Sequence, residues 1–266
     1  MPVFAVRDVM MHAVDEGVAR PVVFLHGLPF DHSLWEHQRR ELRSEHRVII
    51  PDLRGFGRTS LGTRTSLTLQ DYADDVLALL EAAEVCEPVV LCGLSMGCYL
   101  ALLLGLQAPE RWRGLVLCNG RAAADTPQAA AQREEMAQRV LKEGSQVLVQ
   151  ALLPKLFSPL TRQHQPHVVE TVKNVMERTS PQTLATVQRA MAARVDLTER
   201  LSHITCPCLV IAGSDDPISP PSEMQAWSQR LPHSQFFIVP DASHLAPLEQ
   251  PEMVNHHLRT FLARLF

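Results

Sequence analysis

The sequence predicts an α/β fold: a mostly parallel central sheet with helices on both faces and an inserted helical cap. Short apolar runs alternate with segments of helical periodicity along most of the chain, which is the pattern of strands joined by crossover helices. One long segment, residues 122–200, breaks this alternation and shows only helical patterns. The 266 residues, 46% of them hydrophobic and 20% charged, suffice for one large domain that carries an insertion.

Six continuous apolar runs are predicted to form the strands of the sheet. They lie at residues 21–25, 47–50, 88–92, 115–118, 208–212 and 235–239. The first twenty residues are expected to add an antiparallel hairpin at the sheet edge. Residues 69–80 carry apolar side chains at helical spacing, and Thr68 with Asp71 resembles a capping box at the start of that helix. A last helix is predicted over residues 254–265, whose apolar side chains share one face.

Residues 122–200 form the predicted cap. Within them, residues 168–179 have a clear apolar stripe at helical spacing. The residues that punctuate the helical patterns are Gly144, Pro154, Pro159, Pro166 and Pro181. Ligand sites of open α/β sheets lie at the carboxyl ends of the strands, where this insertion emerges, so a cap is favoured over extra helices packed beside the sheet. The predicted organisation is a core of residues 1–121 and 201–266 and a cap of residues 122–200.

Composition excludes several classes of partner and cofactor. The net charge of −4 lacks the basic excess that nucleic acids or anionic membranes require, and no run of about 18 apolar residues could span a bilayer. The first residues do not resemble a signal peptide, so a cytoplasmic location is expected. The six cysteines mostly lie in apolar runs and predict neither a disulfide framework nor a zinc site. No metal or other cofactor is expected.

Residues 93–97 read G-L-S-M-G, and they join an apolar run to a second apolar stretch, residues 98–104. This order predicts a strand, a tight turn and a helix. In that context G-x-S-x-G is typical of a nucleophile elbow, which lifts the serine hydroxyl above the sheet edge and aims the next backbone N–H at the same point. An ordinary serine in a small-residue turn is the alternative, but the flanking strand and buried helix count against it. Ser95 is therefore predicted to be the nucleophile of a serine hydrolase.

A serine nucleophile needs a base, and the base needs an orienting acid. Among twelve histidines, His244 stands out because it follows the predicted strand at 235–239 and precedes the last helix, so its loop can reach the elbow. The acid is expected between nucleophile and base in the chain. The loop after the strand at 208–212 carries Asp215 and Asp216, and either carboxylate could serve. The loop after the strand at 115–118 offers no carboxylate.

Two backbone N–H groups are expected to bind the oxyanion of the reaction. One belongs to Met96, directly after the nucleophile, and the other is expected in the loop after the strand at 21–25. Gly27 lets that loop turn closely, so the N–H of Leu28 can point inward, whereas Pro29 has no N–H to offer. Loss of one such donor typically costs about 3 kcal/mol of transition-state stabilisation.

Five segments in this order resemble the landmarks of the α/β-hydrolase superfamily. They are residues 26–29 (H-G-L-P), 52–57 (D-L-R-G-F-G), 93–97 (G-L-S-M-G), 213–217 (G-S-D-D-P) and 243–244 (S-H). The resemblance covers the chain apart from the inserted block, and it implies that the third residue after the strand-ending glycine, Asp216, is the acid. Residues 190–217 are most similar to 3-oxoadipate enol-lactonases and related small carboxylesterases. The Pro29 loop instead resembles that of cofactor-free haloperoxidases, which are esterases with perhydrolase side activity.

The predicted function is hydrolysis of a small carboxylic ester or lactone, a small-molecule substrate, through an acyl-enzyme. The residues expected to carry it are Ser95, Asp216 and His244 as catalytic groups, with Leu28 and Met96 at the oxyanion. Two other classes stay open: cleavage of a carbon–carbon bond in a β-diketone by the same residues, and a receptor-like protein that binds a small hydrophobic ligand beneath the cap. A perhydrolase side activity that depends on Pro29 is a further expectation.

Overall fold

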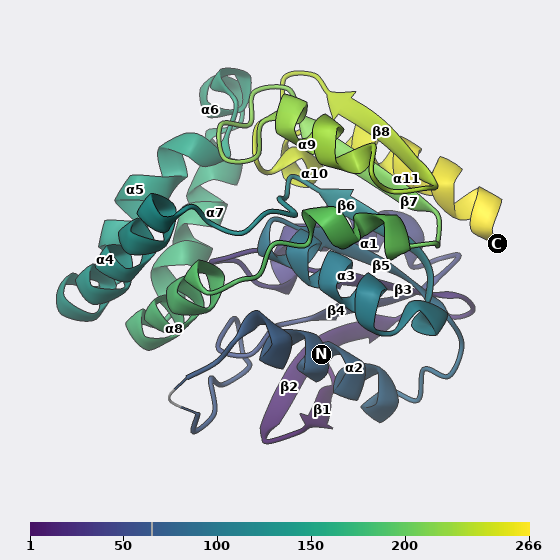
Figure 1. Ribbon diagram of the computed structural model, residues 1–266, viewed down its shortest axis with the longest axis horizontal. Helices are drawn as coiled ribbons and strands as arrows, with labels where there is room; N and C mark the ends of the chain where they lie inside the picture. The colour runs from purple at the N-terminus through teal and green to yellow at the C-terminus, as the bar shows by residue number, and fades with distance from the viewer. Residues whose placement is uncertain (65) are drawn as a thin grey trace.

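The computed structural model describes residues 1–64 and 66–266 and is built around one eight-stranded sheet (Figure 1). The strands follow the order β1-β2-β4-β3-β5-β6-β7-β8 across the sheet. Their bounds are β1 Val3–Val6, β2 Val9–Glu16, β3 Pro21–Leu25, β4 Arg47–Pro51, β5 Val89–Leu94, β6 Trp112–Cys118, β7 Cys208–Gly213 and β8 Ser234–Val239. The pairs β1–β2 and β2–β4 are antiparallel. All other pairs of neighbouring strands, from β4 across the sheet to β8, are parallel. The predicted fold class, the six strands and the edge hairpin are confirmed.

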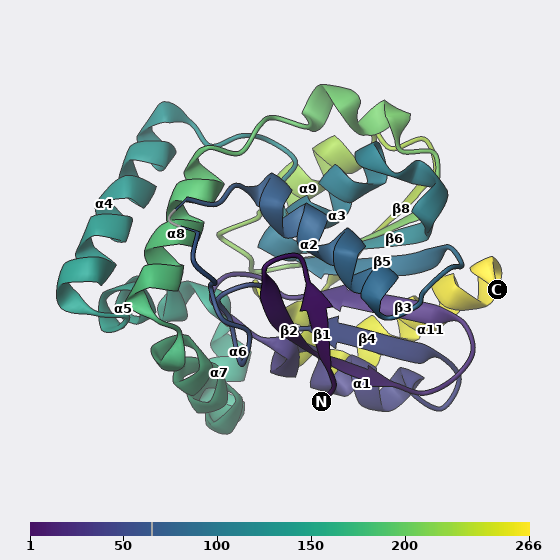
Figure 2. The ribbon, with the colours of Figure 1, turned by 90° about the horizontal axis from the view of Figure 1, so that it is seen from below.

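Helices cover both faces of the sheet, as Figure 2 shows from below. In β3, Val23 and Leu25 point into one apolar core and Val22 and Phe24 into the other, so alternate residues of one apolar run serve opposite faces. The helices on the first face are α2 Leu69–Ala82, α3 Met96–Gln107 and α9 Pro221–Ser228, and those on the second are α1 Glu36–Leu42 and α11 Pro251–Leu265. The predicted capping box at the start of α2 is present, with Thr68 and Asp71 bonded reciprocally.

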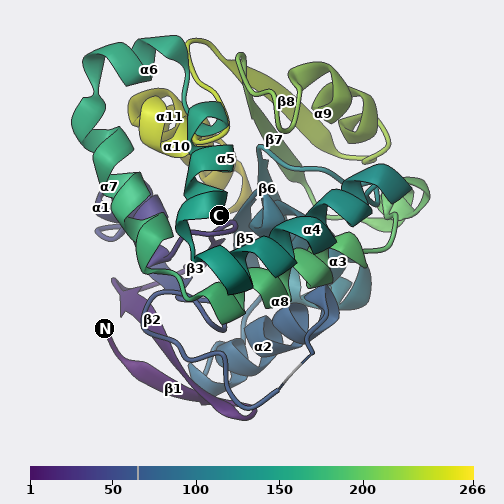
Figure 3. The same ribbon diagram turned by 90° about the vertical axis from the view of Figure 1, so that its left-hand side faces the viewer.

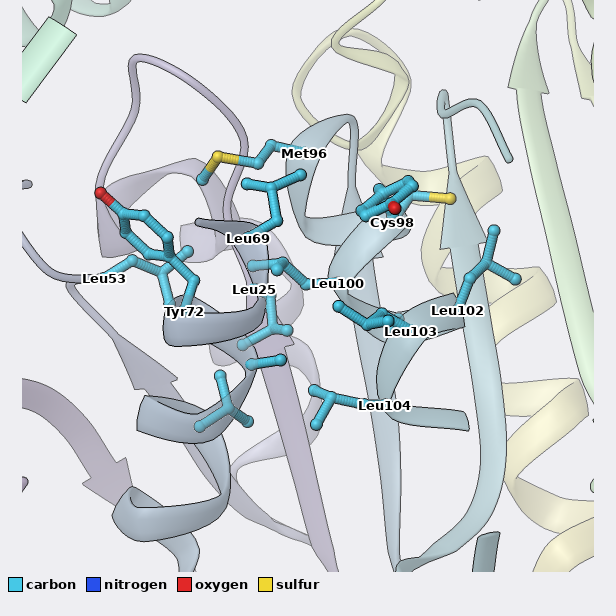
Figure 4. Close-up of a cluster of buried hydrophobic side chains, with 14 of the residues drawn as sticks. Leu25, Leu53, Leu69, Tyr72, Met96, Cys98, Leu100, Leu102, Leu103 and Leu104 are labelled. Atoms are coloured by element: carbon cyan, nitrogen blue, oxygen red, sulfur yellow. The ribbon is translucent and has the colours of Figure 1, made fainter. Parts of the chain in front are cut away.

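Helix α3 is apolar on every side because it is buried on every side. Ten of its residues, from Met96 to Gly105, are buried. Figure 4 shows its leucines in the apolar cluster that also contains Leu25 of β3, Leu53 after β4 and Tyr72 of α2. A helix that is hydrophobic all round fits only such a site. This burial fixes the axis of α3, and with it the turn that precedes the helix.

Residues 122–200 contain five α-helices and no strand between β6 and β7. The helices are α4 Pro127–Glu143, α5 Gln146–Leu156, α6 Pro159–His164, α7 Pro166–Arg178 and α8 Pro181–Ala192. Thr126, Ser158 and Ser180 each accept a hydrogen bond from the N–H of the third residue of the following helix, and a proline follows each of them at the first helical position. Pro154 does not separate two helices, as its place among the punctuating residues predicts, because it lies within the last turn of α5.

The helical block lies over the carboxyl ends of the strands. It bonds the loops that follow three of them: the Thr179 hydroxyl donates to Pro29 O after β3, and the Thr183 hydroxyl donates to Gly55 O after β4. After β8, the Leu245 N–H donates to Leu156 O. Figures 1 and 3 show the same helices gathered on one side of the sheet. None of the helices formed by the described residues combines the length and hydrophobicity needed to cross a lipid bilayer.

Candidate active site

Ser95 occupies a strained turn between β5 and α3. Its φ of 57° and ψ of −113° place it in a region that residues with a side chain rarely adopt. The turn is tied to the sheet on one side, where the Ser95 N–H donates to Cys118 O at 3.0 Å, and to the helix on the other, where Ser95 O accepts from the Tyr99 N–H. The surrounding structure therefore imposes this backbone conformation on the serine.

The two glycines of the G-L-S-M-G segment are required by close backbone contacts. A Cβ on Gly93 would lie 2.1 Å from Gly97 O, and a Cβ on Gly97 would lie 2.3 Å from Leu25 O. Neither position has room for a side chain. The glycines thus let the strand-to-helix turn close on itself and rest against the end of β3.

The loop after β3 lies directly against Ser95. A Cβ on Gly27 would approach Ser95 Cβ to 2.9 Å and Leu94 O to 3.0 Å. In the described chain no protein acceptor is bonded to the N–H of Leu28 or of Met96, the latter being among the N–H groups that a helix start leaves unpaired. Both predicted oxyanion donors therefore belong to residues that directly follow the Gly27–Ser95 contact in the chain, and the described residues leave both N–H groups unbonded.

His26 anchors this loop from behind. Its ring is fully buried, its Nδ1 lies 2.9 Å from Gly27 O, and its Nε2 lies 3.0 Å from the Leu53 N–H. The second contact requires an unprotonated Nε2, so the proton is on Nδ1 and is donated to Gly27 O. Burial lowers the pKa of His26, which favours this neutral form. Through these two hydrogen bonds His26 links the loop after β3 to the loop after β4.

His244 and Asp216 form a buried hydrogen-bonded pair. His244 Nδ1 lies 2.8 Å from Asp216 Oδ2, and their exposed fractions are 2% and 3%. A Cβ on Gly213 would lie 2.1 Å from Ser243 O, so this glycine lets the histidine loop cross the end of β7. The neighbouring carboxylate, that of Asp215, is exposed and accepts only from the Ser214 hydroxyl among the residues that the structure describes.

Donors on all sides hold the Asp216 carboxylate. Oδ1 accepts from the N–H groups of Ile218 and Ser219 at 2.8 and 3.0 Å, and Oδ2 accepts from His244 and from Asn119 Nδ2 at 2.9 Å. Burial raises the pKa of Asp216, but His244 and the donated hydrogen bonds outweigh it, so the pKa lies below the usual aspartate value. The Asp216 carboxylate is therefore ionised at neutral pH.

Asn119 is a site residue that the sequence analysis did not assign. It follows β6 with a φ of 45°, and its amide also donates to Ser243 O at 3.1 Å. It therefore joins the acid to the histidine loop. The signal was its position at the carboxyl end of a strand, but that position was assessed only for a carboxylate.

Four neighbouring strands bring the predicted residues to one edge of the sheet. Ser95 follows β5, Asn119 follows β6, Asp216 follows β7 and His244 follows β8. Within the described residues no hydrogen bond joins Ser95 Oγ to His244, so this structure forms the acid–base link of the predicted set but not the base–nucleophile link. Such contacts often tighten only when substrate is bound.

One cluster has the composition of a metal site. The atoms offered by Asp31, His32 and Asp52 lie within 4.8 Å of one another. However, Asp52 already accepts from the His32 ring and backbone and from the Arg58 N–H, and Asp31 caps the following turn through the Ser33 N–H. These hydrogen bonds account for the cluster, so we assign no metal to it.

A strained serine, a glycine loop resting on it and a later His–Asp pair thus occupy the carboxyl edge of one parallel sheet. Residues 20–251 match the family described as the alpha/beta hydrolase fold. The chain belongs to the α/β-hydrolase fold family. This confirms the family resemblance drawn from the five sequence segments.

Relatives of this α/β-hydrolase extend over nearly its whole length. A 3-oxoadipate enol-lactonase of Acinetobacter baylyi is 33% identical over 234 residues, which is 88% of this chain and 85% of that protein. The structure of a thermophilic esterase from Thermogutta terrifontis, with malate bound, has a TM-score of 0.95 and 36% identity and covers 99% and 98% of the two chains. The enol-lactonase from Burkholderia xenovorans LB400 has a TM-score of 0.92 and 27% identity over 98% and 100%.

Proposed function

We propose that the protein is a serine hydrolase that cleaves a small carboxylic ester or lactone through an acyl-enzyme. The observation that carries the proposal is the buried His244–Asp216 pair on the same sheet edge as the strained Ser95. A histidine with a purely structural role would not need an ionised partner, whereas Asp216 is kept ionised by three donors besides His244. The Acinetobacter and Burkholderia relatives named as enol-lactonases and the esterase from Thermogutta terrifontis support this reaction class.

The proposed mechanism uses each group at a stated atom. Ser95 Oγ attacks the carbonyl carbon while His244 Nε2 takes its proton, and the imidazolium is stabilised by Asp216 through Nδ1–H. The N–H groups of Leu28 and Met96 hold the oxyanion. The tetrahedral intermediate expels the alcohol, which takes the proton from His244. Water, deprotonated by the same nitrogen, then attacks the acyl carbon of the acyl-enzyme. The second tetrahedral intermediate expels Ser95 Oγ, which takes the proton from His244 as the carboxylic acid leaves.

We further propose that residues 122–200 act as the cap of this site. Helices α7 and α8 bond the loops after β3 and β4, and the end of α5 bonds the loop after β8. The block therefore contacts the predicted oxyanion loop and the predicted base loop at once. Such a cover limits the size of the substrate and excludes water from the reacting atoms.

A substrate panel tests the proposed reaction class. We expect turnover of short-chain p-nitrophenyl esters or of small lactones, monitored by nitrophenolate release or by acid production. Hydrolysis of β-diketones without ester turnover would instead identify a carbon–carbon bond hydrolase. Binding of small hydrophobic ligands with no turnover of any class would identify a receptor-like protein.

A methyl group on Gly27 should impair catalysis without unfolding the protein. In Gly27→Ala the new Cβ must move away from Ser95 Cβ, so the loop and the Leu28 N–H retreat from the oxyanion. We expect kcat to fall by about 10²- to 10³-fold, as for loss of one oxyanion donor. Steady-state kinetics and a thermal unfolding curve measure both properties. Wild-type kcat in a folded Gly27→Ala protein contradicts the assigned loop role.

A perhydrolase side activity stays a prediction. Pro29 O accepts a hydrogen bond from the Thr179 hydroxyl at 3.2 Å, so this carbonyl has a partner on the helical block. If the same carbonyl also accepts from hydrogen peroxide, peracid formation in acetate should fall in Pro29→Leu while ester hydrolysis persists. Thr179→Val, which removes the competing donor, should raise it. No peracid from the wild type, or equal amounts from wild type and Pro29→Leu, contradicts the prediction.

A further inference from the structure

Glu249 is a buried carboxylate outside the predicted catalytic set. It ends the short helix α10, Ala246–Glu249, and only 1% of its surface is exposed. Its two oxygens accept from two different segments: Oε1 from the Ser243 N–H and Oε2 from the Ser158 N–H, each at 2.7 Å. One side chain therefore bridges the residue before His244 to the helical block.

Two further hydrogen bonds join the same two segments. The Ser243 hydroxyl lies within donating distance of Lys155 O, at 3.1 Å, and of Asp215 O, at 3.2 Å. The Leu245 N–H donates to Leu156 O at 3.3 Å. The histidine loop and the end of α5 are thus connected on both sides of His244. The bonds through Glu249 are the shortest of this set.

Helix α10 is itself held from behind. Gln38 Nε2, from α1, donates to Pro247 O at 3.2 Å and to Asn255 Oδ1 of α11 at 2.9 Å. Gln38 is fully buried and Asn255 nearly so. Glu249 therefore projects from a point that the core holds in place, and its carboxylate links the two segments that it bonds.

The bridge requires a carboxylate. Two N–H groups from opposite sides need an acceptor at each position, which an ionised Glu offers and an amide does not. No Lys, Arg or His side chain pairs with Glu249 in the described part of the chain. Burial accordingly raises the pKa of Glu249, and the hydrogen bonds from Ser158 and Ser243 counter part of this effect.

We propose that Glu249 is a positioning residue that sets the place of His244 and couples it to the cap through Ser158. This inference rests on the proposed serine hydrolase function, because it treats His244 as the base. A shift of the Ser158 segment, as when the cap adapts to a substrate, moves the Glu249 carboxylate and with it the Ser243 backbone. The cap then affects the rate of proton transfer as well as substrate binding.

The first test replaces the acceptor without changing its shape. In Glu249→Gln one N–H faces the amide nitrogen, so we expect kcat for a small p-nitrophenyl ester to fall roughly ten- to a hundredfold, with KM nearly unchanged. Glu252→Gln, the same change at an exposed site on α11, is the matched control and should retain wild-type kinetics. Wild-type kcat in Glu249→Gln overturns the proposal.

The second test breaks the bridge from the cap side. Ser158→Ala and Ser158→Pro both remove the hydroxyl that caps α6. Only the proline also removes the backbone N–H that donates to Glu249 Oε2. The φ of −61° at Ser158 suits proline, so the backbone need not change. We expect kcat to fall in Ser158→Pro relative to Ser158→Ala. Equal kcat values overturn the coupling to the cap, even if Glu249→Gln fails to fold.

A spectroscopic measurement separates this proposal from the proposed function. In protein with ¹⁵N-labelled histidine, the His244 Nδ1–H resonance reports the bond to Asp216, and comparison with His244→Gln assigns it. We expect the resonance to shift or broaden in Glu249→Gln and in Ser158→Pro but not in Glu252→Gln or Ser158→Ala. If no ester is hydrolysed, the proposed function fails and this comparison alone decides the positioning role. An unchanged resonance in both altered proteins overturns it.

Discussion

Ser95→Ala is expected to abolish ester hydrolysis, with kcat reduced on the order of 10⁴- to 10⁶-fold. The substitution removes the atom that we propose as the nucleophile, while the elbow that holds it is fixed by β5, α3 and the close contacts of Gly93 and Gly97. His244→Ala should lose a similar factor, because nucleophile and base act as a unit. Removing both should therefore cost little more than removing either.

The control for this prediction is Ser222→Ala, the same chemical change on the exposed side of α9, which should keep wild-type turnover. Initial rates on a p-nitrophenyl ester are measured for the wild type and all four variants, and thermal unfolding curves establish that each is folded. Near wild-type turnover in Ser95→Ala would end the assignment of the nucleophile.

The strands could be predicted because the sheet is buried on both faces. Residues 21–25 form a continuous apolar run, and in the structure adjacent residues of this run serve opposite cores. Such a continuous apolar run is typical of a strand in a parallel sheet that helices cover on both faces. The elbow was predictable for a related reason: an apolar helix such as α3 directly after a strand must be buried, which leaves the turn at the sheet edge.

The contacts between segments distant in the chain could not be predicted. Asn119 bonds Asp216 across 97 residues, and Glu249 bonds Ser158 across 91. Asn119 stands in the loop after the strand predicted at residues 115–118, and Glu249 precedes the helix predicted over residues 254–265. The partner of each depends on how neighbouring strands and the helical block pack. A polar residue at a strand end is a candidate for such a bond, and only the fold specifies the other partner.

In the helical block, too, the sequence predicts the local structure but not the contacts between distant segments. The apolar stripe predicted over residues 168–179 is present, and its residues Val172, Val175 and Met176 are buried on one face of α7. Periodicity identified the buried face of the helix but not what covers it. The contact of Thr179 with Pro29 O, which links α7 to the loop beside Ser95, became visible only with the block in place.

Asp216→Asn is expected to lower kcat by about 10⁴-fold, the effect of stabilising the wrong imidazole tautomer. The surrounding donors dictate the outcome. Two backbone N–H groups bond Oδ1, so the amide oxygen of the variant must take that position. The amide nitrogen then replaces Oδ2 and faces His244 Nδ1 and Asn119 Nδ2. His244 can bond it only with an unprotonated Nδ1, which places the proton on Nε2, where the serine proton should go.

Asp215→Asn is the matched control for this prediction. The Asp215 side chain is exposed, and among the described residues its carboxylate accepts only from the Ser214 hydroxyl, so an amide there disturbs no part of the His244 pair, and kcat should stay within a few-fold of the wild type. Steady-state kinetics on a p-nitrophenyl ester, with His244 tautomers read from ¹⁵N shifts, measure rate and cause together. A larger loss in Asp215→Asn than in Asp216→Asn would identify Asp215 as the acid and contradict the role that we propose for the buried carboxylate.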